Sequence, residues 1–400
     1  MDAAVTKLLI PDVSGLPRAF WLLFASALVD RLGGFGVVYL AIWLAGPDAP
    51  VGLTVAHAGI AMSAFSVAGI VGGPVGGALA DRHGRKPVLV AGLLTTAASY
   101  LVLGQMSTLV GIAGATALVG LGVNLARPAM TAAIADVVPE EHRRRAFGLH
   151  YWAINLGFAF AAAVAGALAP LGPARVFGLD AAPRVLAAAL LLVAMKDAPT
   201  SGTARARTRI ADLLTGPARD GVMLLVVLVG FMNSAMFHQA GVVLAAEMRA
   251  DGLDTAYGPI LALNGVLIVL LQPTLTQVTT RFRAHHVMAL GCALVGGGFF
   301  ATAFAQGALG HCAAIAVWTL GEILLAATVP TVITRLAPEA MRASYQGLYG
   351  MAWSVSAFAP ALGAWVTARG QADLVWTVCL GLGVVGVVVQ RFIGRSPRMA

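Results

Sequence analysis

Two acidic residues stand inside long apolar stretches of this 400-residue chain, where carboxylates are rare. Asp30 lies about twelve residues into the first stretch and Glu322 about eleven into the tenth, which at a 1.5 Å rise per residue places both near the centre of a bilayer. An ionisable side chain at that depth costs ~2.5–3.5 kcal/mol on insertion scales, so each is a functional-site hypothesis. A carboxylate exposed alternately to the two sides of a membrane can load and release a proton. Asp30 and Glu322 are therefore the predicted proton-coupling residues.

Other polar and aromatic residues in the apolar stretches are candidates to contact a bound molecule. They are Arg31, Asn124, Arg127, Asn233, His238, Trp318 and Trp353. Asp30 and Arg31 are adjacent, so we expect them on different helix faces, each with a partner elsewhere. A structural ion pair, for example Asp30 with Arg127, is an alternative to a coupling role, and a lone histidine in a span such as His238 is more often a packing residue.

The composition bounds the class of protein. Hydrophobic residues make up 59% of the chain, charged residues 11%, and the mean hydropathy is +0.84. A soluble domain has about 25% charged residues, so the sequence excludes a soluble enzyme and a disordered protein, and the absence of short alternating segments excludes a β-barrel. Cys292, Cys312 and Cys379 have spacings that fit no metal site. No nucleophile–base pair, metal cluster or phosphate-binding loop is visible, so we expect no enzyme, metal or cofactor.

Apolar stretches long enough to span a bilayer number twelve. They lie near 19–44, 54–80, 87–107, 109–135, 147–169, 176–195, 221–245, 258–280, 287–306, 311–333, 345–367 and 372–392. The one long polar connection predicts an N-terminal six-helix bundle (1–195), a central loop (196–220) and a C-terminal six-helix bundle (221–400). The sequence predicts an all-α membrane protein with twelve transmembrane helices.

The basic residues predict the orientation. With both termini on one side, that side holds 20 of the 26 Lys and Arg residues. We assign four to the other side: Arg175, Arg184, Arg249 and Arg369. Because positive loops stay in the cytoplasm, both termini are expected there, in the inner (cytoplasmic) membrane. This topology also accounts for the net charge of +8, so no nucleic acid is expected as a partner.

The two halves repeat at an offset of 199 residues. The matched landmarks are Pro74 with Pro273, Arg82 with Arg281, Pro139-Glu140-x-x-Arg143 with Pro338-Glu339-x-x-Arg342, Gly148-Leu149 with Gly347-Leu348, and Ala153 with Ala352. Polar landmarks that keep one offset over separate segments are unlike chance matching of Ala- and Gly-rich helices. Two parallel six-span repeats predict pseudo-twofold symmetry with a central path between the halves.

A short polar motif lies between the second and third spans. Its residues are Gly77, Asp81, Arg82, Gly84, Arg85 and Lys86. It resembles the loop 2–3 signature of the major facilitator superfamily, G-x-x-x-D-R-x-G-R-[RK]. Pro128-Ala129 with Ala135-Asp136 and Pro139, and Gly321-Glu322 with Pro330, resemble patterns of the drug:proton antiporter branch, including its multidrug-resistance-like members. The branch has a Gly-Pro pair in span five where this chain has an Ala-Ala pair, and the usual arginine early in span four is absent.

The resemblance implies a structure and an activity. Asp81 is expected near the start of span eleven and Arg85 beside Asp136, forming a latch that closes the cytoplasmic gate; the alternative is that Arg82, Arg85 and Lys86 only set topology. The implied function is secondary active export of a small amphipathic organic molecule, a drug or natural product, by proton antiport. An importer or facilitator of a small metabolite, and a non-transporting receptor or assembly factor, remain alternatives. The expected partners are a small molecule, protons and the bilayer, and the expected state is a monomer.

Overall fold

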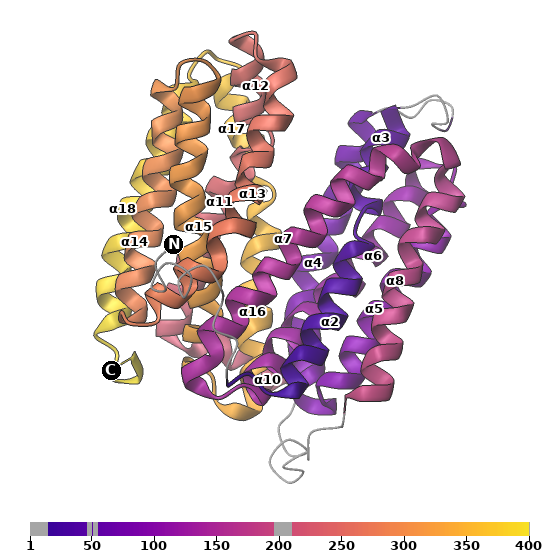
Figure 1. Ribbon diagram of the computed structural model, residues 1–400, viewed down its shortest axis with the longest axis vertical. Coiled ribbons are helices and arrows are strands. Elements are labelled where there is room, and N and C mark those ends of the chain that lie inside the picture. The colour runs from indigo at the N-terminus through magenta and orange to yellow at the C-terminus, as the bar shows by residue number, and fades with distance from the viewer. Residues whose placement is uncertain (1–14, 46–49, 51–54, 196–209, 400) are drawn as a thin grey trace, which may run out of the picture.

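The computed structural model describes residues 15–45, 50, 55–195 and 210–399 and is built of helices (Figure 1). The first half contains α2 (Arg18–Leu32), α3 (Gly36–Ala45), α4 (Val55–His83), α5 (Arg85–Leu103), α6 (Leu109–Val137), α7 (Glu140–Leu168) and α8 (Pro173–Ala194). The second half contains α10 (Ile210–Thr215), α11 (Gly221–Gln239), α12 (Val243–Ala250), α13 (Asp254–Thr279), α14 (Ala284–Ala301), α15 (Gly307–Leu336), α16 (Arg342–Ser356), α17 (Ala359–Thr367) and α18 (Ala372–Gly394). Short 3-10 turns join several of them.

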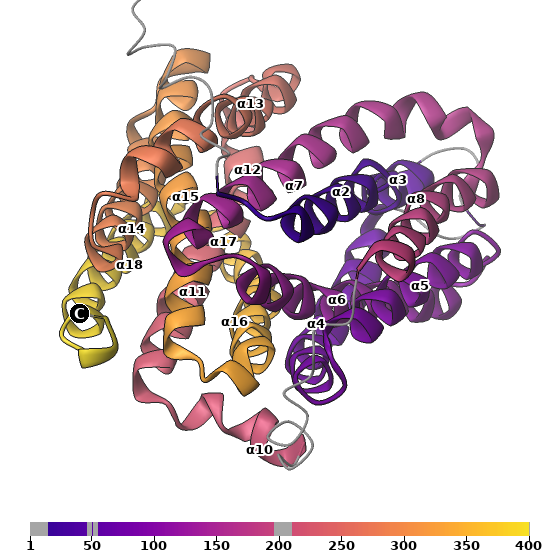
Figure 2. The ribbon, with the colours of Figure 1, turned by 60° about the horizontal axis from the view of Figure 1, so that its bottom comes forward.

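The helices form two groups that are seen side by side in Figures 1 and 2. Helices α2–α8 form one bundle and α11–α18 the other. The groups approach one another at the end that holds the turn between α4 and α5, which we call the motif end, and separate toward the end that holds α3, α12 and α17. The predicted domain boundary lies in 196–220, of which residues 196–209 are outside the described residues.

Ten helical segments of the described chain are long and apolar enough to cross a membrane. The other two predicted spans correspond to α7, which begins with the charged run 140–145, and to α16 followed by α17. Three predicted spans are interrupted: α2 and α3 are separated at 33–35, α11 and α12 at 240–242, and α16 and α17 at 357–358. Interrupted helices leave backbone groups that must be satisfied inside the protein, so they commonly mark binding regions of transporters.

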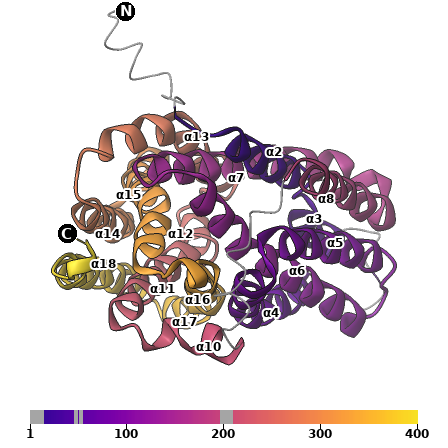
Figure 3. The same cartoon turned by 90° about the horizontal axis from the view of Figure 1, so that it is seen from below.

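Glycines allow the two bundles to touch along α4 and α16, which lie side by side in Figure 3. A Cβ on Gly73 would be 2.9 Å from the carbonyl oxygen of Gly347, and one on Gly77 would be 2.8 Å from Cα of Ser344. Gly76 faces the other way, toward the Leu125 backbone of α6. Helix α4 therefore packs closely on its own bundle with one glycine face and on the other bundle with a second.

The repeat-related contact joins α7 to α13. Gly148 of α7 packs against the side chain of Thr276 in α13. A Cβ atom on residue 148 would lie 3.1 Å from the Cβ atom of Thr276. Gly148 and Thr276 stand at the positions that the 199-residue offset relates to Gly347 and Gly77. The two seams between the bundles are thus built on repeat-related positions.

Candidate functional site: a motif-end contact and a buried carboxylate

Asp81 joins the two bundles at the motif end. Its carboxylate accepts hydrogen bonds from the backbone N–H groups of Ala343 (3.1 Å) and Ser344 (2.7 Å) and from the Ser344 hydroxyl (2.6 Å). The helix ends allow this approach, because α4 stops at Gly84, whose φ of +99° favours glycine, and α16 begins at Arg342. A carboxylate at a helix N-terminus also interacts favourably with the helix dipole. Asp81 therefore occupies the position near span eleven that the motif implies.

A chain of charges extends this contact. Arg85 donates to Asp81 (2.6 Å) and to Asp136 at the end of α6 (3.0 Å). Asp136 also accepts a hydrogen bond from Arg342 of the other bundle (2.8 Å). Arg85 and Asp81 are nearly fully buried, so water screens this network little. The Arg85–Asp136 contact that the resemblance implies is present, and Arg342 extends it across the seam.

The repeat-related seam is held by a different charge. The position equivalent to Asp81 is Thr280, so no carboxylate is available there. Instead, buried Arg144 near the start of α7 donates to the carbonyl oxygens of Thr279, the last residue of α13, and of Phe282 just beyond it (3.2 Å for Phe282). One seam therefore uses an anion at a helix N-terminus and the other a cation near a helix C-terminus, as the helix dipole favours in each case.

Glu322 lies where the bundles meet deeper in the membrane. Its carboxylate accepts hydrogen bonds from the Tyr151 hydroxyl of α7 and from the Asn264 amide of α13 (2.8 Å). Asn264 also donates to Thr319, one turn before Glu322 (3.0 Å). No basic side chain of the described residues forms an ion pair with Glu322. The carboxylate is thus solvated by two neutral donors, one from each bundle.

Asp30 lies in a different environment, inside the first bundle. It is 3.5 Å from the guanidinium of Arg31 and 3.7 Å from that of Arg184 in α8. Arg184 is a partner elsewhere of the kind expected for Asp30, whereas the direct contact between adjacent Asp30 and Arg31 was not expected. Arg184, which was counted among the four basic residues of the other membrane side, lies within α8, is 4% exposed and pairs with Asp180 one turn earlier.

Asp180 holds the break in the first span. Its carboxylate accepts the backbone N–H of Gly36 at the start of α3 (2.5 Å), while Arg184 donates to the Gly33 carbonyl at the end of α2 (3.1 Å). This ion pair of α8 therefore satisfies both backbone ends of the interrupted helix, and Asp30 belongs to the same buried network.

Two guanidinium groups and an imidazole gather near the middle of the first bundle. The charge of Arg31 acts on Arg127 of α6, and both charges act on His150 of α7. Within the described chain, the Arg127 guanidinium has no hydrogen bond or ion pair. Nδ1 of His150 is buried without a hydrogen-bond partner. Asp30 and Asp180 contact Arg31 and Arg184, so among the described residues the cluster keeps polar groups of Arg127 and His150 available for another group.

The profile of the Major Facilitator Superfamily matches residues 23–360, most of the chain. The chain belongs to this superfamily. Solved structures agree with the fold: a bacterial homologue of the iron transporter ferroportin in its outward-facing state superposes with a TM-score of 0.79 at 16% identity, over 95% of this chain and 100% of that one. The family and its twelve-span architecture make the protein a multi-pass membrane transporter and not an enzyme.

Relatives within the superfamily differ in their stated activities. An uncharacterized MFS-type transporter of Bacillus subtilis, YqjV, is 23% identical and covers 95% of this chain and 94% of its own. A Na⁺, Li⁺, K⁺/H⁺ antiporter of Planococcus maritimus is 26% identical over 68% and 72% of the two chains. The quinolone resistance protein NorA of Staphylococcus aureus is 27% identical over 45% and 47%.

The remaining site candidates of this superfamily member divide into two kinds. Trp318 is 1% exposed and stacks on Phe299, so it packs the core of the second bundle. Asn124 is also buried and donates to the Gly120 carbonyl of its own helix. Asn233 likewise donates to its own helix, at Val229, and lies 3.6 Å from the Cys292 sulfur.

His238 and Trp353 remain accessible. The His238 ring lies 4.9 Å from that of Trp353, which is 40% exposed. Phe237 contacts the same indole ring at 5.9 Å. These three side chains form an aromatic surface between α11 and α16, close to the interruptions of spans seven and eleven.

Four residues of the site were not predicted as site residues from the sequence. Asp180 and Arg184 are the eighth and twelfth of the 22 residues of α8, and their i, i+4 spacing was a signal that they pair. Tyr151 and Asn264 are neutral, and nothing in their neighbourhood along the chain links them to Glu322. Their shared role depends on three helices from two bundles.

Proposed function

We propose that this transporter exports a small amphipathic organic molecule across the cytoplasmic membrane in exchange for protons, with the motif end facing the cytoplasm. The observation that carries the proposal is the position of Glu322. It is a membrane-embedded carboxylate without an ionic partner among the described residues, and it receives one hydrogen bond from each bundle. Protonation of such a group changes the contact between the bundles directly.

The coupling step follows from the hydrogen bonds. Ionised Glu322 accepts from Tyr151 and Asn264, and hydrogen bonds to a charged acceptor are worth about twice those to a neutral one. A proton on Glu322 removes the charge and weakens the α7–α15 contact, which favours separation of the bundles at this depth. A proton that enters from one side and leaves to the other therefore shifts the balance between the two arrangements.

The basic cluster of Arg31, Arg127 and His150 in the first bundle favours a substrate with a hydrogen-bond acceptor or an anionic end. Among the described residues, the Arg127 guanidinium and Nδ1 of His150 have no hydrogen-bond partner, and the charge of Arg31 acts on both. An unpartnered cation in a low-dielectric region is unfavourable, so a substrate acceptor at Arg127 gains more than the same contact would in water. The accessible aromatic ring of Trp353 suits an apolar end.

The names of two relatives support this proposal. One is an antiporter that exchanges cations for protons, and another is a quinolone resistance protein. Motif-end closure by Asp81, Arg85, Asp136 and Arg342 provides the second gate that alternating access requires. Import or facilitated diffusion on the same fold is the competing function, and it differs in the response to a pH gradient.

The decisive experiment uses purified protein in proteoliposomes with an imposed pH gradient. The probes are a fluorescent quinolone and a fluorescent aromatic carboxylate. We expect the gradient to accelerate uphill transport by wild type, and Glu322→Gln to lose that acceleration while keeping substrate exchange at equal pH. Glu247→Gln is the matched control, because Glu247 is another half-buried carboxylate of the second bundle, bonded to Trp376 (2.8 Å) within the bundle.

Two results would contradict the proposal. Equal acceleration of wild type and Glu322→Gln by the gradient would exclude Glu322 as the coupling group. Transport by wild type that only equilibrates the probe, with no response to the gradient, would instead identify a facilitator. Tyr151→Phe separates the two parts of the mechanism, since it removes the inter-bundle hydrogen bond and leaves the carboxylate in place.

A further inference from the structure

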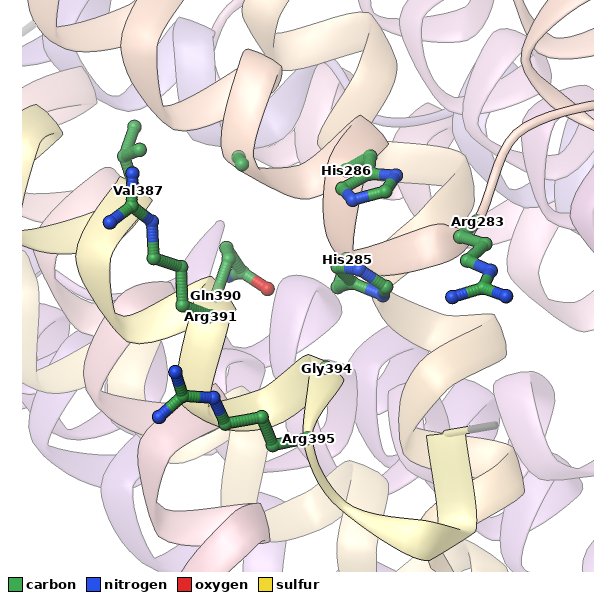
Figure 4. A pocket seen from close by; sticks show the side chains of 9 residues that line it. Arg283, His285, His286, Val387, Gln390, Arg391, Gly394 and Arg395 are labelled. Carbon is green, nitrogen blue, oxygen red and sulfur yellow. The ribbon is translucent and has the colours of Figure 1, made fainter.

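A basic pocket lies away from the proposed transport path, between the start of α14 and the end of α18 (Figure 4). Its volume is about 530 Å³. Three arginines line it, Arg283 from one helix end and Arg391 and Arg395 from the other, together with His285 and His286. None of the nine described residues that line this pocket is acidic.

The arginines of the pocket have no acidic partner in the described part of the chain. Within the described chain, Arg283, Arg391 and Arg395 form no ion pair and no side-chain hydrogen bond, although Arg395 lies over the Phe392 ring at 6.0 Å. Other basic residues at this end do have acidic partners; Arg398, for example, binds Asp220 at 2.7 Å. Three positive side chains gathered without a counter-ion favour an anionic ligand.

A buried amide provides a second, independent sign of a ligand. Gln390 is 1% exposed, and neither its amide nitrogen nor its amide oxygen has a hydrogen-bond partner in the described part of the chain. Figure 4 shows this amide pointing into the space between the helices, toward His285. Nδ1 of His285 is also buried and without a partner. A buried polar group without a partner costs about 1–3 kcal/mol, so both groups fit a pocket that is filled in the working protein.

The geometry of α14 adds to the attraction for an anion. The helix starts at Ala284, directly after Arg283, and no side chain caps its first turn. Its first backbone N–H groups and the positive end of its dipole thus point toward the basic cluster. Phosphate is the anion that matches several arginine donors together with backbone N–H groups.

The surroundings favour a phosphate carried by a lipid. On α18 the exposed apolar residues Val384, Val388 and Phe392 follow one another at intervals of four, so they form a stripe that leads along the helix from the pocket. Leu290, six residues into α14, is 54% exposed. A headgroup in the pocket would place acyl chains on these side chains.

We propose that this pocket, which we call the α14–α18 pocket, binds the phosphate headgroup of an anionic phospholipid at the motif end of the second bundle. Arg283, Arg391 and Arg395 bind the phosphate oxygens, and Gln390 with His285 completes their hydrogen bonding. The lipid would then tie the ends of α14 and α18 together, independently of the substrate and of Glu322.

The test measures lipid binding by native mass spectrometry of the full chain released from detergent. The probes are phosphatidylglycerol, phosphatidylcholine as the neutral lipid, and water-soluble glycerol phosphate. One basic residue near an anionic lipid surface is worth about fivefold in affinity, so Arg283→Gln/Arg391→Gln/Arg395→Gln should weaken phosphatidylglycerol binding about a hundredfold. Arg18→Gln/Arg219→Gln/Arg281→Gln removes the same charge from exposed positions outside the pocket and should keep the wild-type affinity.

A second variant separates a ligand site from a general charge effect. Gln390→Leu removes the unpaired buried amide and keeps the side chain's size. We expect the lipid-free protein to keep or raise its melting temperature, while the rise that phosphatidylglycerol gives in wild type becomes smaller. Such opposite changes are not expected of a residue that only packs the bundle.

Three outcomes would overturn the proposal. The first is equal phosphatidylglycerol binding by the pocket variant and its charge-matched control. The second is equal affinity of wild type for phosphatidylcholine and phosphatidylglycerol. The third is glycerol phosphate binding as tightly as the lipid, which would assign the pocket to a soluble phosphate compound.

Discussion

Replacing Asp81 by asparagine should open the motif end. Three hydrogen bonds cross the seam from Ala343 and Ser344 to this one carboxylate, at 2.6–3.1 Å. Asparagine keeps a single acceptor oxygen and places an NH₂ group where the second oxygen accepts. The two arrangements of the bundles then differ less in free energy, because the closed arrangement loses a contact that the open arrangement never has.

The magnitude follows from the number and kind of these bonds. A hydrogen bond to a charged group contributes about 1.5–3 kcal/mol, and the variant weakens all three while abolishing at least one. Arg85 keeps its bonds to Asp136 (3.0 Å) and to the Ala80 carbonyl (2.8 Å), so it is not left unpaired. We therefore expect a loss of about 2–4 kcal/mol, which is roughly a 30- to 1000-fold shift toward the open arrangement.

Hydrogen exchange of the backbone amides measures this shift, because the N–H groups of Ala343 and Ser344 are the donors concerned. Their exchange in Asp81→Asn should accelerate by the factor above, whereas amides of the α14–α18 contact should keep wild-type rates. Arg335→Gln is the control: it breaks the cross-bundle pair with Glu140 (2.7 Å), which is largely exposed and is worth at most about 1 kcal/mol. Unchanged exchange at 343–344 would refute a closing role for Asp81.

Three further predictions concern glycine packing, the buried ion pair of α8, and Asp220, the N-cap residue of α11. Gly73→Val should accelerate the same amide exchange, because its Cβ meets the α16 backbone at 2.9 Å, whereas Gly59→Ala on the same helix, with no atom within 4 Å of its Cβ, should not. Asp180→Asn should lower the free energy of unfolding by about 1.5–3 kcal/mol, seen as a lower melting temperature, because buried Arg184 loses its charged hydrogen-bond partner and keeps Asp30, 3.7 Å away, as its acid. Hydrogen bonds from Arg398 lower the pKa of Asp220, so the stability that this carboxylate contributes is present above about pH 4, the unfolded pKa, and is lost as the pH falls through the folded value. The melting temperatures of wild type and Asp220→Asn should therefore differ at pH 7 and converge once the pH is below the lowered folded pKa of Asp220.

The fold was predictable because its signals are local. Apolar length identifies spans, and the 199-residue offset and the motif from Gly77 to Lys86 identify the superfamily. The interruptions at 33–35, 240–242 and 357–358 were not predicted, because an apolar run looks the same whether its helix is continuous or broken. Only tertiary contacts, such as the bond from the Gly36 N–H to Asp180, stabilise the break in the first span.

The candidate site was predictable in its charges but less so in its partners. Burial cost alone singles out Glu322 and Asp30. Their partners come from helices far away in the sequence, and two of those, Tyr151 and Asn264, are neutral. Arg184 was counted with the basic residues of one membrane side although it lies in the middle of α8, because a charge count takes no account of an ion pair inside a bundle such as that with Asp180.

The seam between α4 and α16 brings the backbones of the two helices into close contact at Gly73, Gly77 and Gly347. A glycine has no side chain for the opening of this contact to wet, and heat capacity rises chiefly when apolar surface meets water. The enthalpy of the conformational exchange should thus change little with temperature. A van't Hoff plot of the exchange should be close to a straight line.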